Sequence, residues 1–235
     1  MKIEIWSDFI CPYCYLGKRH LELALEQFPH KEKVIVVYKS FQLEDHTHHN
    51  DDQFVSEVFL NNENRIEKSM ELNERLREQA LGVGLRLNVE KLLHVTTLDA
   101  HRLVKHAETI GLANELVTKL FEAYFTGNVN LHKVETLISI VKEVGMDEVK
   151  AEEILQTCKY RNSVLEDMQV AEEMAVKGIP FFVINEKYSL SGAQPIEYFQ
   201  QVLETIWEEE GSKFSKHKKK LSTTKYCEGN YCKDK

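Results

Sequence analysis

The feature that most constrains the fold of this chain is the motif CPYC at residues 11–14, which separates two segments of different periodicity. Before it, residues 2–7 alternate in polarity and predict a β-strand. After it, the apolar positions of residues 15–28 fit one face of a helix, and Pro12 occupies a position that the first turn of a helix tolerates. A β-branched segment at 33–43 predicts a second strand. The chain therefore opens as a strand–helix–strand unit of the kind that parallel crossovers form.

The middle of the chain predicts helices. From residue 44 to 176 the sequence is rich in Glu, Lys, Leu and Ala and shows one helical period after another. We expect helices at 51–62, 64–81, 89–109, 112–126, 131–144, 147–157 and 160–177. Strand character returns at 178–192, where the pair at 185–186 is a hairpin signal, and Pro195 opens a last helix. Strands at both ends with helices between them predict one α/β sheet interrupted by a helical insertion.

These boundaries divide the chain into four parts. We expect the first half of the α/β unit at 1–43, the helical insertion at 44–176, the second half at 177–211 and a flexible tail at 212–235. The tail is polar and charged and has no apolar period. Its basic run KHKKK is interpreted as a solvated segment.

The composition narrows the functional classes. The 235 residues carry a formal net charge of −8 and a pI near 5.7, so no basic field is present to bind nucleic acid. No apolar stretch is long enough to cross a bilayer, and charged residues interrupt the N-terminal run that a secretory signal would need. We therefore expect a cytoplasmic protein without nucleic-acid or membrane partners. Five cysteines are too few for a disulfide scaffold of this length, so close pairs favour catalysis or metal binding.

The first cysteine pair has the spacing of a redox site. At the first turn of a helix, the Cys11 sulfur faces unpaired backbone N–H groups and the positive end of the helix dipole. Both favour the thiolate and can lower a cysteine pKa from about 8.5 to roughly 3.5–7.5. Cys14 lies one turn further on, within reach of Cys11 and more sheltered. The pair suits a two-step exchange, in which Cys11 attacks a substrate disulfide and Cys14 resolves the mixed disulfide.

Other interpretations of the cysteines stay open. Cys11 and Cys14 could be ordinary core residues, or they could bind zinc together with Cys227 and Cys232. Zinc ligands need neither Pro12 nor a strand–helix setting, and the second pair lies in the predicted tail, so we predict no metal site. Cys227 and Cys232 are either an auxiliary dithiol that exchanges electrons with the first pair or inert tail thiols, because pairing geometry cannot be judged from sequence.

The order of these elements resembles the DsbA-like branch of the thioredoxin superfamily, and more narrowly its FrnE-like cytosolic members. The resemblance covers approximately residues 1–210, and beyond CPYC it rests on SFQLE at 40–44, TTLDAHRLVKHA at 96–107, LFEAYF at 120–125 and GIPFFVIN at 178–185. It implies a thioredoxin fold with a large all-helical insertion and thiol–disulfide oxidoreductase activity on protein or small-molecule disulfides. No tightly bound cofactor is implied, although glutathione could recycle the pair. We expect a monomer or a homodimer.

The resemblance also implies roles for residues near the cysteines. Pro180 matches the cis-proline of the family, which leaves the backbone of Ile179 free to pair with an extended substrate segment. Pro12 and Tyr13 complete the predicted substrate-binding positions. Kappa-class glutathione transferases and 2-hydroxychromene-2-carboxylate isomerases share this fold but commonly have serine where Cys11 stands. A glutathione-dependent transferase or isomerase is therefore the first alternative function, and a non-enzymatic zinc-binding protein is the second.

The remaining candidate residues have structural interpretations. We expect Cys158 to be a buried packing residue and the three histidines of residues 44–51 to lie in a solvated loop. His101 and Arg102 lie on a predicted helix, where we expect packing with Asp99 and a hydrogen-bonded histidine. A role for His101 and Arg102 that faces the substrate is the alternative.

Overall fold

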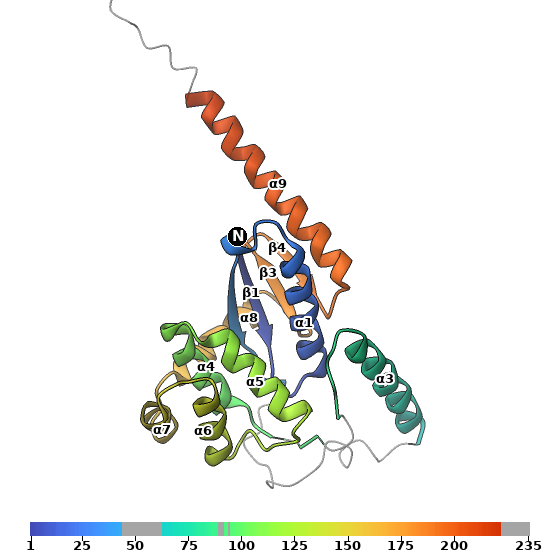
Figure 1. The fold of residues 1–235 in the computed structure, drawn as a ribbon, viewed down its shortest axis with the longest axis vertical. Coiled ribbons are helices and arrows are strands. Elements are labelled where there is room, and N and C mark those ends of the chain that lie inside the picture. Colours follow the sequence, from blue (N-terminus) through green and yellow to red (C-terminus); the bar gives the residue numbers. More distant parts are fainter. Residues whose placement is uncertain (44–62, 89–91, 94, 222–235) are drawn as a thin grey trace, which may run out of the picture.

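The structure, a computed structural model, describes residues 1–43, 63–88, 92, 93 and 95–221. A central β-sheet carries helices on its faces, and further helices gather at one end of it (Figure 1). In chain order the elements are β1 (Lys2–Ser7), α1 (Pro12–Gln27), the short 3-10 helix η1 (Lys31–Lys33), β2 (Ile35–Ser40), α3 (Glu63–Gly82), α4 (Leu98–Ile110), α5 (Ala113–Phe125), α6 (Val134–Glu143), α7 (Glu148–Gln156), α8 (Arg161–Glu173), β3 (Phe181–Ile184), β4 (Tyr188–Ser191) and α9 (Ile196–Leu221).

The sheet joins the two ends of the chain. Its strands lie in the order β2-β1-β3-β4, and β1 runs parallel to β2, with Lys2 opposite Ile35. β3 is antiparallel to both β1 and β4, and Ile3 of β1 lies opposite Ile184 of β3. Because β1 and β3 pair directly, the segments before and after the helical insertion form one sheet. The predicted α/β fold with a helical insertion is confirmed.

The alternation of β1 sends its side chains to two different helical layers. Ile3 and Ile5 are buried in the main core together with Phe199 of α9 and the buried face of α1. Trp6 points to the other face of the sheet, where its indole Nε1 donates a hydrogen bond of 2.9 Å to the backbone carbonyl of Asp167 on α8. The period of two in the sequence thus decides which helices cover which face of the sheet.

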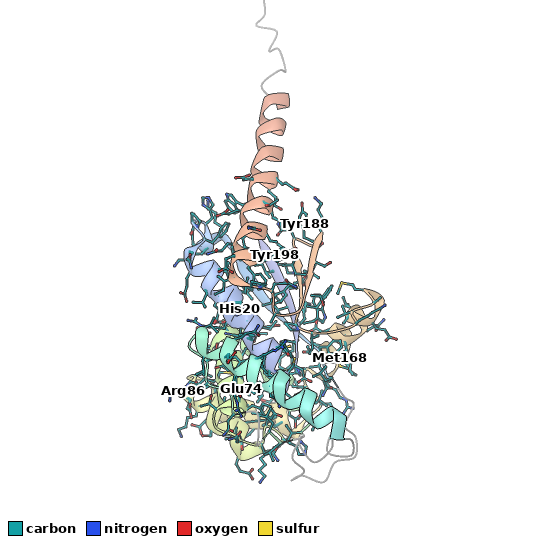
Figure 2. The ribbon with its side chains drawn as sticks, turned by 90° about the vertical axis from the view of Figure 1, so that its right-hand side faces the viewer. His20, Glu74, Arg86, Met168, Tyr188 and Tyr198 are labelled. Atoms are coloured by element: carbon teal, nitrogen blue, oxygen red, sulfur yellow. The ribbon has the colours of Figure 1, made fainter. Side chains whose placement is uncertain are left out.

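The hairpin and the loop after it fix the second half of the sheet against α1. Asn185 and Glu186, between β3 and β4, both have positive φ angles, of 50° and 57°, which confirms the hairpin at the predicted pair. On α1, His20 lies with its Nδ1 2.8 Å from the carbonyl oxygen of Gln194 in the loop before α9 (Figure 2). This contact joins α1 to the loop between β4 and α9.

The two largest differences from the predicted helix boundaries lie at the start of α4 and the end of α9. The helix expected at 89–109 begins only at Leu98. The described residues around its expected start, 85–88, 92, 93 and 95–97, are non-helical, although Leu87 and Leu92 among them are buried. Backbone contacts hold that segment, since the Asn88 N–H donates to the carbonyl oxygen of Phe125. A helical period is thus not proof of a helix where an extended segment can bury the same side chains.

The last helix is also longer than expected. α9 continues through Gly211 to Leu221, into the part that the sequence assigns to a flexible tail, and Figure 1 shows it extending beyond the sheet. Lysine has a high helix propensity, so a basic segment without proline can continue a helix. The helix expected at 51–62 lies outside the described residues. Within the described part of the chain, no helix is long and apolar enough to cross a membrane.

Candidate active site

Cys11 and Cys14 lie where β1 gives way to α1. Cys11 is the N-cap residue of α1, with Pro12 in the first turn, and its backbone N–H donates a 3.1 Å hydrogen bond to the carbonyl oxygen of Asp8. The Cys14 N–H donates to the Cys11 carbonyl oxygen at 3.0 Å. Both cysteines are free thiols, and their exposed fractions are 6% for Cys11 and 1% for Cys14. Both residues are therefore buried, Cys14 slightly more than Cys11.

The environment shifts the two thiol pKa values in opposite directions. The pKa of Cys11 is lowered, chiefly by the hydrogen bond that the Cys14 side chain donates to its sulfur. Burial and the Asp8 charge oppose this shift, and the backbone N–H groups of Cys14 and Tyr13 add to it. The pKa of Cys14 is raised well above its ordinary value, first by burial and then by its hydrogen bond to Cys11. The sequence predicts the lowered Cys11 pKa and the help of backbone N–H groups, and the structure adds the hydrogen bond from the Cys14 side chain as the largest cause.

A cis-proline loop faces the cysteines. The peptide bond between Ile179 and Pro180 is cis, as the resemblance implies, and the carbonyl oxygen of Ile179 lies 3.9 Å from Cys11 Sγ. Pro180 is buried and Ile179 is half-buried. Residues from opposite ends of the chain thus lie together because β3 pairs with β1 and continues from this loop.

Gly17 on α1 lets the loop come this close. A Cβ atom at Gly17 would lie only 2.9 Å from Pro180 Cγ and 3.4 Å from Phe182 Cζ. Real side chains do not tolerate the shorter distance without movement, so the packing of α1 against the cis-proline loop depends on glycine here. Sequence reasoning missed Gly17, because nothing local to α1 indicates that a distant loop packs on it.

Asp8 is a buried carboxylate beside the cysteine pair, and sequence reasoning missed it too. It is 1% exposed. Its Oδ1 accepts a hydrogen bond of 2.7 Å from Thr97 Oγ1, and its Oδ2 accepts one of 2.9 Å from the Leu43 backbone N–H. The available signal was an acidic residue directly after a buried strand and three residues before Cys11.

His101 and Arg102 have different surroundings although they are neighbours on α4. Arg102 donates to Asp99 Oδ1 at 2.7 Å and to the carbonyl oxygen of Lys159 at 2.8 Å. It also bonds the carbonyl oxygens of Ile154 and Thr157 at the end of α7. The predicted packing of Arg102 with Asp99 is confirmed.

The expectation of a hydrogen-bonded His101 is wrong for one of its ring nitrogens. The side chain is buried, and its Nε2 has no hydrogen-bond partner among the described residues. This atom lies 3.8 Å from Asp8 Oδ1, too far for a hydrogen bond, and the ring is 4.7 Å from that of Phe9. The segment 96–107, which carries part of the resemblance, therefore places His101 beside Asp8.

The other candidate residues lie apart from this site or outside the described residues. Pro12 and Tyr13 are half-buried beside Cys11, and the pKa of Tyr13 is raised by burial and then by the charge on Cys11. Cys158 is exposed between α7 and α8, so the expectation of a buried packing thiol is wrong. The helix that precedes it ends two residues earlier, at Gln156, which leaves the thiol in a surface connection. Cys227 and Cys232 lie outside the described residues, as do the histidines of 44–51.

A metal centre finds no support in the described part of the chain. Across residues 1–43, 63–88, 92, 93 and 95–221, no group of three or more His, Cys, Asp or Glu side chains is arranged to hold a metal ion. A zinc site with four thiolates would also need Cys227 and Cys232, which lie outside these ranges. The chemistry that the described residues do support is that of an adjacent dithiol.

Comparison with known proteins identifies the family. The DSBA-like thioredoxin domain matches residues 2–204, so the chain belongs to this family of thiol–disulfide oxidoreductases. The structure is similar to that of a probable DsbA oxidoreductase from Streptomyces coelicolor, with a TM-score of 0.82 and 33% identity over 89% of this chain and 91% of that one.

Two more distant proteins are also similar to this chain, one in sequence and one in structure. An uncharacterized protein of Bacillus subtilis, YwbO, is 23% identical over 203 residues, which cover 86% of this chain and 94% of that protein. A 2-hydroxychromene-2-carboxylate isomerase superposes with a TM-score of 0.68 at 16% identity, covering 90% of this chain and 98% of its own. The last similarity shows a shared fold and does not extend to activity.

Proposed function

We propose that this protein catalyses dithiol–disulfide exchange of the reductase or isomerase type on protein or small-molecule disulfides, as a FrnE-like member of its family. The observation that carries the proposal is the opposite shift of the two thiol pKa values, lowered for Cys11 and raised for Cys14, beside a cis-proline loop. A nucleophile must be a thiolate at neutral pH, whereas a resolving thiol must stay protonated until it is needed.

The exchange takes place in two steps. The Cys11 thiolate attacks one sulfur of the client disulfide, a Cys11–client disulfide forms, and the other client sulfur leaves as a thiolate. Cys14 then loses its proton and attacks Cys11, so that the Cys11–Cys14 disulfide forms and the second client sulfur leaves. Two electrons pass from the dithiol to the client, and the client thiolates take up protons.

The client would bind across the loop of Ile179 and Pro180. The Ile179 carbonyl lies next to the Cys11 sulfur, so an extended client segment paired with this backbone would bring its disulfide to the nucleophile. Pro12 and Tyr13, half-buried and next to Cys11 in the chain, would form another part of the client-binding surface. Recognition of this kind uses backbone groups and therefore accepts many client sequences.

The direction of electron flow depends on the cellular compartment, which we propose is the cytoplasm. In the cytoplasm, where thiols are kept reduced, the pair would rest as a dithiol and act on client disulfides. Glutathione or another thiol would then reduce the Cys11–Cys14 disulfide, and no tightly bound cofactor is required. Cys227 and Cys232 could act as an auxiliary dithiol. The protein would work as a monomer or a homodimer, without nucleic-acid or membrane partners.

Insulin reduction with a thiol reductant tests the proposal. Cys11→Ser should reduce turnover to background, and Cys14→Ser should accumulate a mixed disulfide with insulin that gel electrophoresis detects. Cys158→Ser, the exposed thiol on another element, is the matched control and should leave turnover unchanged. A wild-type pair that does not oxidise and reduce reversibly would contradict the proposal. Glutathione conjugation that persists in Cys11→Ser would favour the transferase or isomerase instead.

The tail pair has its own test. If Cys227 and Cys232 transfer electrons to or from the first pair, the double serine variant should lose turnover with at least one client or reductant. Unchanged turnover with all of them would make the second pair inert.

A further inference from the structure

A cleft between α1 and β2 takes no part in the exchange reaction. Its volume is about 510 Å³, and neither the cysteines nor the cis-proline loop lines it. Its apolar lining includes Leu21 and Leu25 of α1 and Val36 and Tyr38 of β2, and Asn114 lines it from the start of α5. Sites for small ligands have this size, and they are mainly apolar with a few polar groups that fix the ligand.

Lys18 is a buried cation in the lining of this cleft. The residue is 3% exposed, although lysine is almost never fully buried unless it is paired. Its Nζ donates a hydrogen bond of 2.7 Å to Thr118 Oγ1 on α5 and another to Glu22 Oε1, one turn further along α1. Among the described residues, Glu22 is the one carboxylate that forms an ion pair with it. Burial lowers the pKa of Lys18, and the Glu22 charge opposes this shift.

The other lysine that is buried among the described residues, Lys105, has a different kind of partner. Its Nζ lies 2.6 Å from Asp167 Oδ2, and the Asp167 side chain is buried as well. The Glu22 side chain is instead 29% exposed, and it lines the cleft. Its second oxygen, Oε2, lies 3.7 Å from Arg19 Nη1. Glu22 can therefore leave Lys18 and keep a basic partner, which frees the buried ammonium group for another carboxylate.

The charges of the cleft favour an anion. Basic residues outnumber acidic ones in its lining by three to two, whereas the whole chain carries a formal net charge of −8. The Tyr38 hydroxyl donates to Asn114 Oδ1 at 2.7 Å, so the group that Asn114 can offer to a ligand is its NH2. An amine ligand would compete with Lys18 for Glu22 and would leave a buried ammonium group without its ion-pair partner.

We propose that the cleft between α1 and β2 binds a small amphipathic carboxylate, whose head group replaces Glu22 at Lys18 and whose hydrocarbon chain lies against the apolar lining. A carboxylate at Lys18 Nζ would accept a charge-assisted hydrogen bond, which is stronger than one between neutral groups. Binding of the chain would remove apolar surface from water. The site is separate from the cysteine pair, so its test does not depend on the proposed function.

Titration of the reduced wild-type protein with octanoate, followed by two-dimensional 1H–15N NMR, tests the proposal. We expect saturable binding of one octanoate per chain, with the largest shifts at the backbone amides of residues 18–26 and of β2. Two matched ligands separate the parts of octanoate, because octanol has the chain without the charge and acetate has the charge without the chain. Each should bind at least about tenfold more weakly than octanoate.

Two variants test the exchange of partners at Lys18. Lys18→Met keeps an apolar side chain, so it should weaken octanoate binding by about tenfold or more and leave octanol binding unchanged. Glu22→Gln removes the competing carboxylate and should tighten octanoate binding by about threefold or more. Glu26→Gln is the matched control, since Glu26 lines the same cleft but pairs with Arg19, at 3.5 Å. It should change the affinity by less than about twofold.

The contrary results are equally specific. Octanoate that causes no saturable shifts at the cleft would overturn the proposal, and so would octanol that binds as tightly as octanoate. Octylamine that binds more tightly than octanoate would assign the cleft to amines instead. If Lys18→Met does not fold, Glu22→Gln still decides, because its side chain is partly exposed. An affinity for octanoate equal to that of the wild type would then contradict the replacement of Glu22 by the ligand.

Discussion

The two faces of the sheet bury side chains of different character. The face toward α1 and α9 buries mainly apolar side chains, such as Ile3, Ile5 and Phe182. The face toward α8 buries the apolar Trp6 and Val183 and, beside them, a group of charges centred on Asp167. Its carboxylate lies 2.6 Å from Lys105 Nζ and 3.1 Å from Lys39 Nζ, and it accepts a hydrogen bond of 2.8 Å from the Ser40 backbone N–H.

This difference between the faces explains how the helical insertion is oriented relative to the sheet. Apolar packing is non-directional, so it holds α1 firmly but leaves orientation to shape alone. Hydrogen-bonded charges are directional and costly to leave unpaired, so the Asp167 contacts fix α4 and α8 in one arrangement relative to β2. That arrangement brings Thr97 and His101 of α4 to Asp8.

The largest effect is expected on the apolar face. Phe182 is fully buried, and its ring centre is 5.0 Å from that of Phe199 on α9. Phe182→Ala should lower the free energy of unfolding by about 3–5 kcal/mol, because it removes apolar contacts and leaves a cavity. Urea unfolding measures this. A loss below about 1 kcal/mol would mean that the core can close over the gap.

The charged face should respond to a single change and recover with a second. Asp167→Ala leaves Lys105 buried without its closest acidic partner and should cost roughly 3 kcal/mol. Adding Lys105→Met should restore much of that stability, because an apolar pair needs no partner. If the double variant is no more stable than Asp167→Ala, the contact with Lys105 is not what makes the single change costly.

A smaller effect is expected where α1 meets the cis-proline loop. Gly17→Ala should cost about 1–3 kcal/mol, since its Cβ would overlap Pro180 Cγ. The added methyl group should also displace the loop of Ile179 and Pro180. The rate of insulin reduction should therefore fall further than the smaller fraction of folded protein would account for. Gly82→Ala is the matched control, because a Cβ at Gly82, the last residue of α3, would meet no atom within 4 Å. Equal activity in Gly17→Ala and the wild type would show that the loop position is not critical.

The sequence predicts those parts of the site that leave a local signal. The CPYC motif at 11–14 and the segment around Pro180 each indicate their role, and the period of two in β1 indicates the sheet. Asp8 and Gly17 give little local signal, because each matters through a contact with a residue more than 80 positions away. Asp8 accepts a hydrogen bond from Thr97, and Gly17 packs against Pro180. The expectation for Cys158 is wrong because the burial typical of a lone cysteine is a property of the residue type, whereas this residue lies in the exposed connection between α7 and α8.

The measurement that tests the account most directly is the pH dependence of alkylation at each cysteine in the reduced wild-type protein, followed by peptide mass spectrometry. We expect Cys11 to react first and to keep reacting at pH values where an ordinary thiol, with a pKa of about 8.5, has stopped, while Cys14 stays unmodified. In Cys14→Ala the Cys11 midpoint should rise, because the hydrogen bond that lowers its pKa most is gone. Equal reactivity of both thiols with an ordinary midpoint would contradict the assignment of nucleophile and resolving cysteine.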